Sequence, residues 1–231
     1  MNKKITISSE LIYILAPLIT ALGTVILTMA DYGISMLVAF PYIISLKISV
    51  LTFGQISYII QGLLFILLMI MLRKIKALYI FSFISAFIFG ITLDFWQKIL
   101  SWTDLVSYAA DAKTGLRIII FIVGFLLNAF GVTLYFKTYF YPQVYEFFVK
   151  EISKKYKIPF HRFKHCFDIA FLGIDICLAC FLFHRLRGIG AGTVLIALLN
   201  GPLIHRYDDF LERYFNIRPI FSKFAEKFKI E

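Results

Sequence analysis

Long apolar runs alternate with short polar or basic stretches along nearly the whole chain. Six of these runs approach or reach the roughly 20 residues that a helix rising about 1.5 Å per residue needs to cross about 30 Å of hydrocarbon. The pattern therefore predicts six transmembrane helices. They cover residues 11–30, 56–72, 77–96, 116–136, 166–183 and 189–204.

Two further segments are too short to cross a membrane. One is the apolar stretch 33–45, which contains Pro41, and the other is the mixed stretch 142–153, which contains Glu146 and Lys150. A short helix of this kind either lies at the membrane interface or enters the membrane and returns, shielded by protein. The sequence therefore predicts two short interfacial or re-entrant helices.

The two halves of the chain match each other in order and spacing. Corresponding residues lie 108 to 111 positions apart along the whole half. Each half holds three predicted spans, and an odd number reverses the direction in which the second half enters the membrane. The sequence therefore predicts an all-α polytopic membrane protein built from two inverted three-helix repeats. The clearest matches set Ala21, Gly23, Ser82, Ala86, Gly90 and Asp94 against Ala129, Gly131, Thr193, Ala197, Gly201 and His205.

The repeat divides the chain into four parts. The first repeat covers residues 1–103, a wetter connecting loop covers 104–115, and the second repeat covers 116–206. The tail, 207–231, is polar with aromatic residues interleaved. It predicts an amphipathic helix on the cytoplasmic surface, broken at Pro219.

Composition also indicates an integral membrane protein. Hydrophobic residues make up 60% of the chain and charged residues 16%, against about 45–50% and about 25% in soluble domains. In such a chain the net charge of +10 favours contact with anionic lipid at the cytoplasmic face over nucleic-acid binding. Cys166, Cys177 and Cys180 share one apolar run and are predicted as small buried residues. No metal or cofactor is expected.

The basic residues are unequally divided between the two sides of the predicted membrane. If the N-terminus is cytoplasmic, 18 of the 24 Lys and Arg residues lie in cytoplasmic segments. Because Lys and Arg accumulate in cytoplasmic loops, both termini are predicted to be cytoplasmic. The other side holds Lys47, Lys98, Lys113, Arg117, Arg185 and Arg187.

Two carboxylates in the fifth span are the first candidates for a functional site. Asp168 and Asp175 are seven residues apart and so share a helix face, and His165 lies three residues before Asp168 on that face. A charged residue in a span costs about 2.5–3.5 kcal/mol on insertion scales and marks a functional-site candidate. These three residues are candidates to bind a proton or a cationic substrate. Two structural alternatives remain open. Asp168 forms an ion pair with Lys164 or another interfacial cation, or Asp175 takes part in a structural hydrogen bond with a neighbouring span.

Asp94 and His205 occupy equivalent positions in the two repeats. Inversion places them near opposite faces of the membrane, which suits residues of two gates. The same placement suits ordinary polar ends of spans, and the sequence leaves both interpretations open.

Four glycines lie in the last predicted span or just before it. Gly188, Gly190 and Gly192 alternate at its start, and Gly201 lies near its end. The spacing differs from the G-x-G-x-x-G pattern of dinucleotide sites. Such glycines allow close helix approach in a membrane, or expose backbone amides to an anionic ligand.

The stretch 188–204, with its three alternate glycines and Asn200-Gly201-Pro202, resembles the closing motif of the bacterial YczE/YyaS/YitT membrane-protein family. The stretches 32–35, 53–54 and 89–94 resemble other parts of that family, and the resemblance covers most of residues 11–206. It implies a bacterial plasma-membrane protein of five or six spans, in a family described as uncharacterised or as candidate transporters. Tyr139-Phe140-Tyr141 departs from the expected glycine-containing turn.

These features together predict a secondary transporter of a small solute, either cationic or proton-coupled, that works by alternating access between inverted repeats. Two alternatives stay open. One is a substrate-binding membrane subunit of a multi-component importer, and the other is a non-transporting membrane accessory protein. The expected protein partner is either an ATPase or a second copy of the chain. The sequence contains no recognisable nucleophile set or phosphate loop, so catalysis is not expected.

Overall fold

The computed structural model describes residues 4–73, 76–103, 109 and 113–229, and most of them are helical. The elements in chain order are β1 (Ile5–Ser8), α1 (Ser9–Ala30), α2 (Met36–Ser45), α3 (Phe53–Leu72), a 3-10 turn (Ala77–Tyr79), α4 (Ile80–Trp102), α6 (Thr114–Phe136), α7 (Val144–Tyr156), α8 (Phe160–Phe183), α9 (Ala191–Tyr214), β2 (Phe215–Arg218) and α10 (Ser222–Lys229). The predicted connecting loop, 104–115, lies mostly outside the described residues.

Five of the helices are long and apolar enough to cross a membrane, which supports the prediction of an all-α membrane protein. They are α1, α3, the 3-10 turn continued by α4, α6 and α8. The predicted sixth span, 189–204, lies in α9, which is not among the five. That helix runs ten residues further, to Tyr214, and its second half carries His205, Arg206, Asp208 and Asp209.

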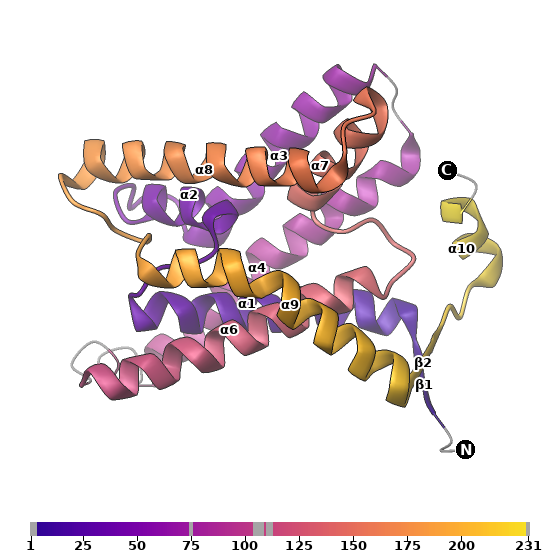
Figure 1. The fold of residues 1–231 in the computed structure, drawn as a ribbon, viewed down its shortest axis with the longest axis horizontal. Coiled ribbons are helices and arrows are strands. Elements are labelled where there is room, and N and C mark those ends of the chain that lie inside the picture. The colour runs from indigo at the N-terminus through magenta and orange to yellow at the C-terminus, as the bar shows by residue number, and fades with distance from the viewer. Residues whose placement is uncertain (1–3, 74–75, 104–108, 110–112, 230–231) are drawn as a thin grey trace.

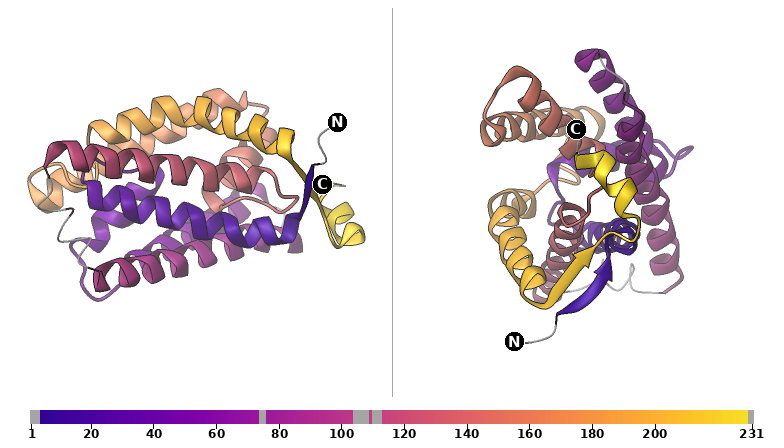
Figure 2. Two further views of the ribbon diagram at one scale, coloured as in Figure 1. Left: turned by 90° about the horizontal axis from the view of Figure 1, so that it is seen from below. Right: turned by 90° about the vertical axis from the view of Figure 1, so that its right-hand side faces the viewer.

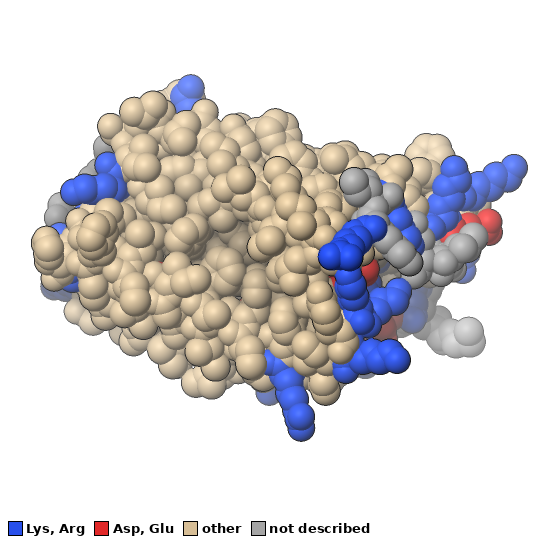
Figure 3. Space-filling model, turned by 90° about the horizontal axis from the view of Figure 1, so that it is seen from above, with Lys and Arg blue, Asp and Glu red and all other residues tan. Residues whose placement is uncertain are grey.

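The long helices run between two ends of the molecule (Figures 1 and 2). Both termini lie at one end, which we call the terminal end, and the loop that leads into α9 lies at the opposite end. In Figure 1, α1, α6 and α9 lie below, α2, α7 and α8 lie above, and α3 and α4 pass diagonally behind them. Figure 3 shows that the charged residues on one face gather toward the two ends and leave a broad central band uncharged.

The centre of the fold is an antiparallel contact between α1 and α6. At the terminal end, the Tyr139 amide after α6 donates to the Ser9 hydroxyl at the start of α1. At the opposite end, the Arg117 guanidinium near the start of α6 donates to the carbonyl of Ala30 at the end of α1. Because each helix begins where the other ends, the two run in opposite directions.

Glycine lets these two helices approach closely. A Cβ on Gly23 of α1 would collide with the backbone of Asn128, and a Cβ on Gly131 of α6 would collide with Thr20. Small residues at a helix contact allow the backbones to approach. The Asn128 amide, buried at this contact, donates to the Thr24 hydroxyl at 2.9 Å.

The short helices α2 and α7 lie at the two places where the sequence predicts interfacial or re-entrant helices. They complete a ring of four helices, because α2 contacts α3, α3 contacts α7, α7 contacts α8, and α8 contacts α2.

The fifth candidate span, α8, is the least buried of the candidate spans, and Asp175 and Ala179 are its buried residues. Cys166, Cys177 and Cys180 are all exposed on it, so the prediction of buried cysteines is wrong. Little protein covers the sides of α8, and its exposed side is apolar as well. Apolar neighbours in the sequence therefore do not show that these cysteines are buried.

The tail differs from the amphipathic helix expected over 207–231. Residues up to Tyr214 extend α9, and Phe215–Arg218 then form a strand, β2, which pairs in parallel with β1. Extended pairing with the N-terminal strand satisfies the backbone of this segment. The chain passes Pro219 before the short helix α10 begins, so a break at this proline is present.

The tail is held against the terminal end by a carboxylate and by aromatic rings. The Glu10 carboxylate accepts hydrogen bonds from the amides of Ile220 and Phe221 at 2.9–3.1 Å. On α10, Phe224 and Phe228 pack against Phe81 of α4, with ring centroids 5.7 and 5.6 Å apart. Figure 2 shows α10 lying across this end of the helices.

We expect the Glu10→Gln substitution to loosen the tail, because charge-assisted hydrogen bonds are about twice as strong as neutral ones. Amide hydrogen exchange at Ile220 and Phe221, followed by mass spectrometry, should become roughly tenfold faster. The matched control is Glu226→Gln, which changes an exposed carboxylate of α10 itself. Equal exchange in the Glu10 variant and in the unchanged protein would contradict this role.

Candidate functional site

Asp175 is buried on the inner side of α8 with no accessible surface. Neither of its carboxylate oxygens has a hydrogen-bond partner among the described residues. Buried polar side chains in proteins are usually hydrogen-bonded, and a buried carboxylate without a partner carries a large desolvation cost. The hydrogen bond to a neighbouring span, one of the two structural alternatives, is absent from the described part of the chain.

Tyr145 of α7 is the polar neighbour of Asp175. It is 2% exposed, and its hydroxyl also lacks a partner among the described residues. Its ring packs edge-on against Phe171 of α8, with centroids 5.9 Å apart, one turn before Asp175. Burial raises the pKa of Tyr145, and the charges of Glu146 and Asp175 raise it further. Tyr145 and Asp175 are thus buried polar groups on two helices, α7 and α8, that contact each other.

Helix α3 contributes two more buried polar side chains, Ser57 and Gln61. Both have no accessible surface, and their side-chain polar atoms have no partner among the described residues. They continue the face of α3 on which Leu64 packs with Tyr145. We call Ser57, Gln61, Tyr145 and Asp175 the interior polar groups. They belong to three helices of the four-helix ring.

Apolar clusters close the ring toward both ends. Toward the opposite end, Ala39 and Ile43 of α2 pack with Ala179, one turn beyond Asp175. Toward the terminal end, Phe147 and Phe148 of α7 belong to a cluster that includes Leu68 of α3. The interior polar groups are thus enclosed, and a water-soluble ligand reaches them only if helices move.

Asp168 does not share the environment of Asp175. Its carboxylate lies 3.3 Å from the Lys164 ammonium, one turn earlier on α8, and both side chains are partly exposed. The charge of Lys164 also acts on Glu146 of α7. Burial raises the pKa of the Glu146 carboxyl, and the positive charge of Lys164 lowers it. His165 is exposed. The structure therefore matches the ion-pair alternative for Asp168 and separates Asp168 and His165 from the buried carboxylate.

Asp94 holds the start of α3. Its carboxylate accepts hydrogen bonds from the Thr52 hydroxyl at 2.5 Å and from the Gly54 amide at 2.8 Å. Anions are stabilised at helix N-termini by the unpaired amides and the helix dipole. Gly54 also lies against Gly90 of α4, so closely that a Cβ would collide with the Gly90 carbonyl. The contacts of Asp94 are those of a capping residue that joins two helices.

His205, the counterpart of Asp94 in the repeat, is 78% exposed in its side chain and lies 3.9 Å from Asp209. It has no capping contact among the described residues. The two candidate gate residues therefore have unlike surroundings, and both lie within a helix and not at its end.

The glycines that begin α9 pack against the segment after α1. The Gly192 amide donates to the Tyr32 carbonyl at 2.8 Å, and the Ile34 amide donates to the Gly188 carbonyl at 3.2 Å. A Cβ on Gly190 would lie 2.6 Å from the Tyr32 carbonyl oxygen. A side chain at any of these three glycines would meet Tyr32 or Tyr42, so glycine allows these segments to approach closely.

Gly201 differs from them. A Cβ there would meet nothing within 4 Å. The packing role predicted for Gly201 is not seen, because α9 makes little contact with α8.

Sequence reasoning singled out Asp175 but missed Tyr145. A tyrosine in a short amphipathic helix has no sequence signal that separates a buried hydroxyl from an interfacial one. Gln61 lies within a predicted span, yet its lack of a hydrogen-bond partner among the described residues depends on which helices surround it. No group of three or more metal-ligating side chains is found in the parts of the chain that the structure describes.

The fold is all-α with five helices long and apolar enough to cross a membrane, and it encloses a carboxylate that has no hydrogen-bond partner among the described residues. The chain belongs to DUF6198, a family of unknown function, whose model matches residues 7–209. Comparison with curated proteins and with solved structures gives no match. The matched region contains all the interior polar groups and the glycines of α9, and it ends before β2 and α10.

We expect Asp94→Ala to destabilise the protein by about 1–2 kcal/mol, because it removes a helix cap with two hydrogen bonds. The midpoint of thermal unfolding in detergent should fall. His205→Ala, at the equivalent position of the repeat, is the control and should leave the midpoint unchanged. A loss of stability in the His205 variant alone would contradict the roles given to both residues.

Proposed function

We propose that the protein is a secondary transporter that moves a small, cationic or proton-coupled solute by alternating access between two inverted repeats. The observation that carries this proposal is the enclosed Asp175 carboxylate. An ionisable group inside a membrane domain is rare and usually marks a substrate, ion or proton pathway. The buried Tyr145 hydroxyl and Gln61 amide, on the other helices of the ring, are groups of the kind that bind a small solute.

The pairing of helices supports the inverted repeats. In the proposed repeat, α1, α2, α3 and α4 correspond to α6, α7, α8 and α9. The contact between α2 and α8 then corresponds to that between α7 and α3, and the contact between α1 and α4 corresponds to that between α6 and α9. The antiparallel run of α1 and α6 agrees with inversion. Transporters of this design bind their substrate where the repeats meet.

We propose α9 as the sixth span, with its polar second half emerging at the terminal end. Six spans agree with both termini lying at that end (Figure 1). Because most of the Lys and Arg residues belong to segments of the terminal end, we propose that this end is cytoplasmic. Together with the resemblance noted in the sequence, this supports a multi-pass protein of the bacterial plasma membrane.

One departure from the symmetry suggests which helix moves. In the first repeat, α3 and α4 pack closely at Gly54 and Gly90. In the second, contact between α8 and α9 is marginal at most, and an apolar hollow lies along α8 beside Gly173 and Cys177. Because α8 carries Asp175 and is held by few neighbours, its displacement would open the interior polar groups with little loss of packing.

We expect Asp175→Asn to abolish transport. Wild-type protein and variant, reconstituted in liposomes, are compared by solid-supported-membrane electrophysiology with a panel of amines, amino acids and carboxylates under a proton gradient. Asp168→Asn is the control, because that carboxylate is paired and partly exposed. An unchanged current for an identified solute in the Asp175 variant would remove this residue from the mechanism.

Stability separates a functional Asp175 from a structural one. An unpartnered buried carboxylate destabilises the fold, so Asp175→Leu, which has a similar volume, should raise the midpoint of thermal unfolding by removing a cost of about 1–3 kcal/mol. A structural carboxylate would instead lower the midpoint when replaced. A marked fall in the Asp175→Leu variant would therefore count against a binding role.

A further inference from the structure

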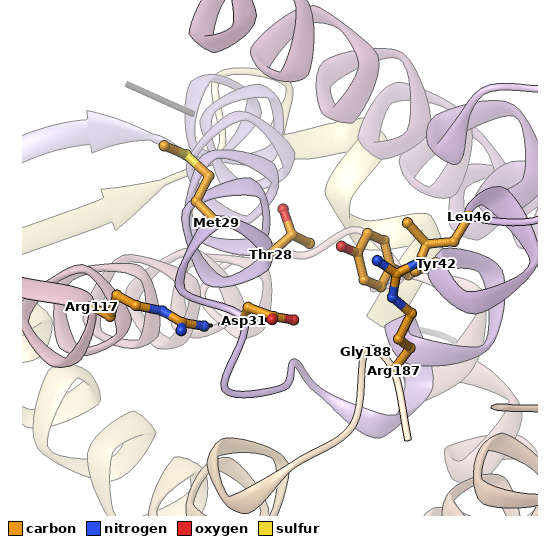
Figure 4. A pocket seen from close by; sticks show the side chains of 8 residues that line it. All are labelled: Thr28, Met29, Asp31, Tyr42, Leu46, Arg117, Arg187 and Gly188. Atoms are coloured by element: carbon orange, nitrogen blue, oxygen red, sulfur yellow. Dashed lines mark ion pairs between the residues drawn. The ribbon is translucent and has the colours of Figure 1, made fainter. Parts of the chain in front are cut away.

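A second polar feature lies at the end opposite the termini. A pocket of about 420 Å³ opens there between the end of α1, the end of α2, the start of α6 and the loop before α9. We call it the end pocket, and Figure 4 shows its lining side chains. The apolar cluster of Ala39 and Ile43 of α2 with Ala179 of α8 separates the level of this pocket from Asp175.

One wall of the end pocket is electrostatically satisfied. The Arg117 guanidinium donates two hydrogen bonds to the Ala30 carbonyl, at 2.9 and 3.1 Å, and lies 3.5 Å from the Asp31 carboxylate. It also covers the ring of Tyr32, with 5.1 Å to the centroid. The charges of Arg117 and Asp31 largely offset each other, as the dashed line in Figure 4 indicates.

The facing wall carries a cation without such a partner. The Arg187 guanidinium lies 5.5 Å from the centroid of the Phe183 ring and makes no hydrogen bond or ion pair with the described residues. The Lys47 ammonium lies 6.0 Å from the centroid of the same ring. The lining residues therefore hold one positive charge more than they hold negative charges, and a second cation stands beside them.

The Tyr42 hydroxyl lies between the two walls. Burial raises the pKa of Tyr42, the charge of Asp31 raises it further, and the charge of Arg187 lowers it. Gly188, next to Arg187, has a φ of +74°, and a Cβ there would lie 2.9 Å from the Tyr42 ring. The glycine thus allows the loop that carries Arg187 to lie directly against Tyr42.

We infer that the end pocket binds an oxyanion, a carboxylate or a phosphate group, through the Arg187 guanidinium with the Tyr42 hydroxyl as a second donor. The planar fork of a guanidinium matches the oxygens of both groups, and such charge-assisted hydrogen bonds are stronger than neutral ones. The guanidinium of the exposed Arg187 also lies over the ring of Phe183. Lys47 adds attraction without a defined hydrogen bond.

Two sources supply this chemistry, a free solute and the head group of an anionic lipid. The end pocket lies where the long helices end, so both reach it. The inference concerns binding alone and does not rest on the proposed transport function. The test therefore measures whether an anion is bound at Arg187. Its outcome does not depend on whether the protein transports a solute.

The test uses phenylglyoxal, which modifies accessible arginines, with the modified residues mapped by mass spectrometry. In neutral detergent, inorganic phosphate or succinate should slow modification of Arg187 severalfold and leave exposed Arg185 unaffected. A second arm uses nanodiscs of phosphatidylcholine alone or mixed with phosphatidylglycerol. Protection by the soluble anions identifies a free solute as the source, and protection only by phosphatidylglycerol identifies a lipid head group. Full reactivity of Arg187 under every condition overturns the inference.

A variant gives an independent measure. Arg187→Gln should weaken binding of radiolabelled succinate or phosphate, or retention of phosphatidylglycerol in native mass spectra, by about tenfold. Arg185→Gln, two residues away, is the matched control and should bind as the unchanged protein does. Equal binding by both variants would also overturn the inference.

Discussion

The close approach of α1 and α6 is the contact on which the rest of the structure depends. It is antiparallel and rests on glycines at equivalent places of the repeat, Gly23 and Gly131. Neither position has room for a side chain, since each Cβ would strike the backbone of the other helix. Within a bilayer, burial of apolar groups contributes little to helix association. Close packing and hydrogen bonds between helices drive it instead. The Asn128 amide adds a buried hydrogen bond to Thr24.

With α1 and α6 fixed, the remaining helices attach in a way that leaves one side loose. Helix α4 packs on α1, and α9 packs on α6. The four-helix ring of α2, α3, α7 and α8 then lies beside this scaffold, and two of its members are too short to cross a membrane. Helix α8 is the least buried of the candidate spans, so it shifts at lower cost than a helix buried along its length. The enclosed carboxylate lies on this helix.

The sequence predicted the helices well because hydropathy reports the length of an apolar run. The short apolar helix near Pro41 follows from the same signal. The sequence did not reveal which side of each helix faces protein, as the exposed Cys166 and Cys180 show. Inside a membrane both the protein-facing and the lipid-facing sides are apolar, so composition does not distinguish them. Contacts between distant segments were also invisible, and for this reason neither the pairing of β1 with β2 nor the approach of Arg187 to Tyr42 was foreseen.

Two polar side chains in neighbouring parts of the fold show how the site differs from the scaffold. Asn128 and Asp175 are both buried within candidate spans. Asn128 satisfies its amide group on the facing helix, and this hydrogen bond offsets the cost of placing it among apolar residues. Asp175 makes no such bond among the described residues, and a charged residue there costs more, about 2.5–3.5 kcal/mol on insertion scales. The polar group of the scaffold contact is satisfied, whereas the ring retains the cost of burying Asp175. This difference favours a carboxylate whose partner arrives from outside the chain.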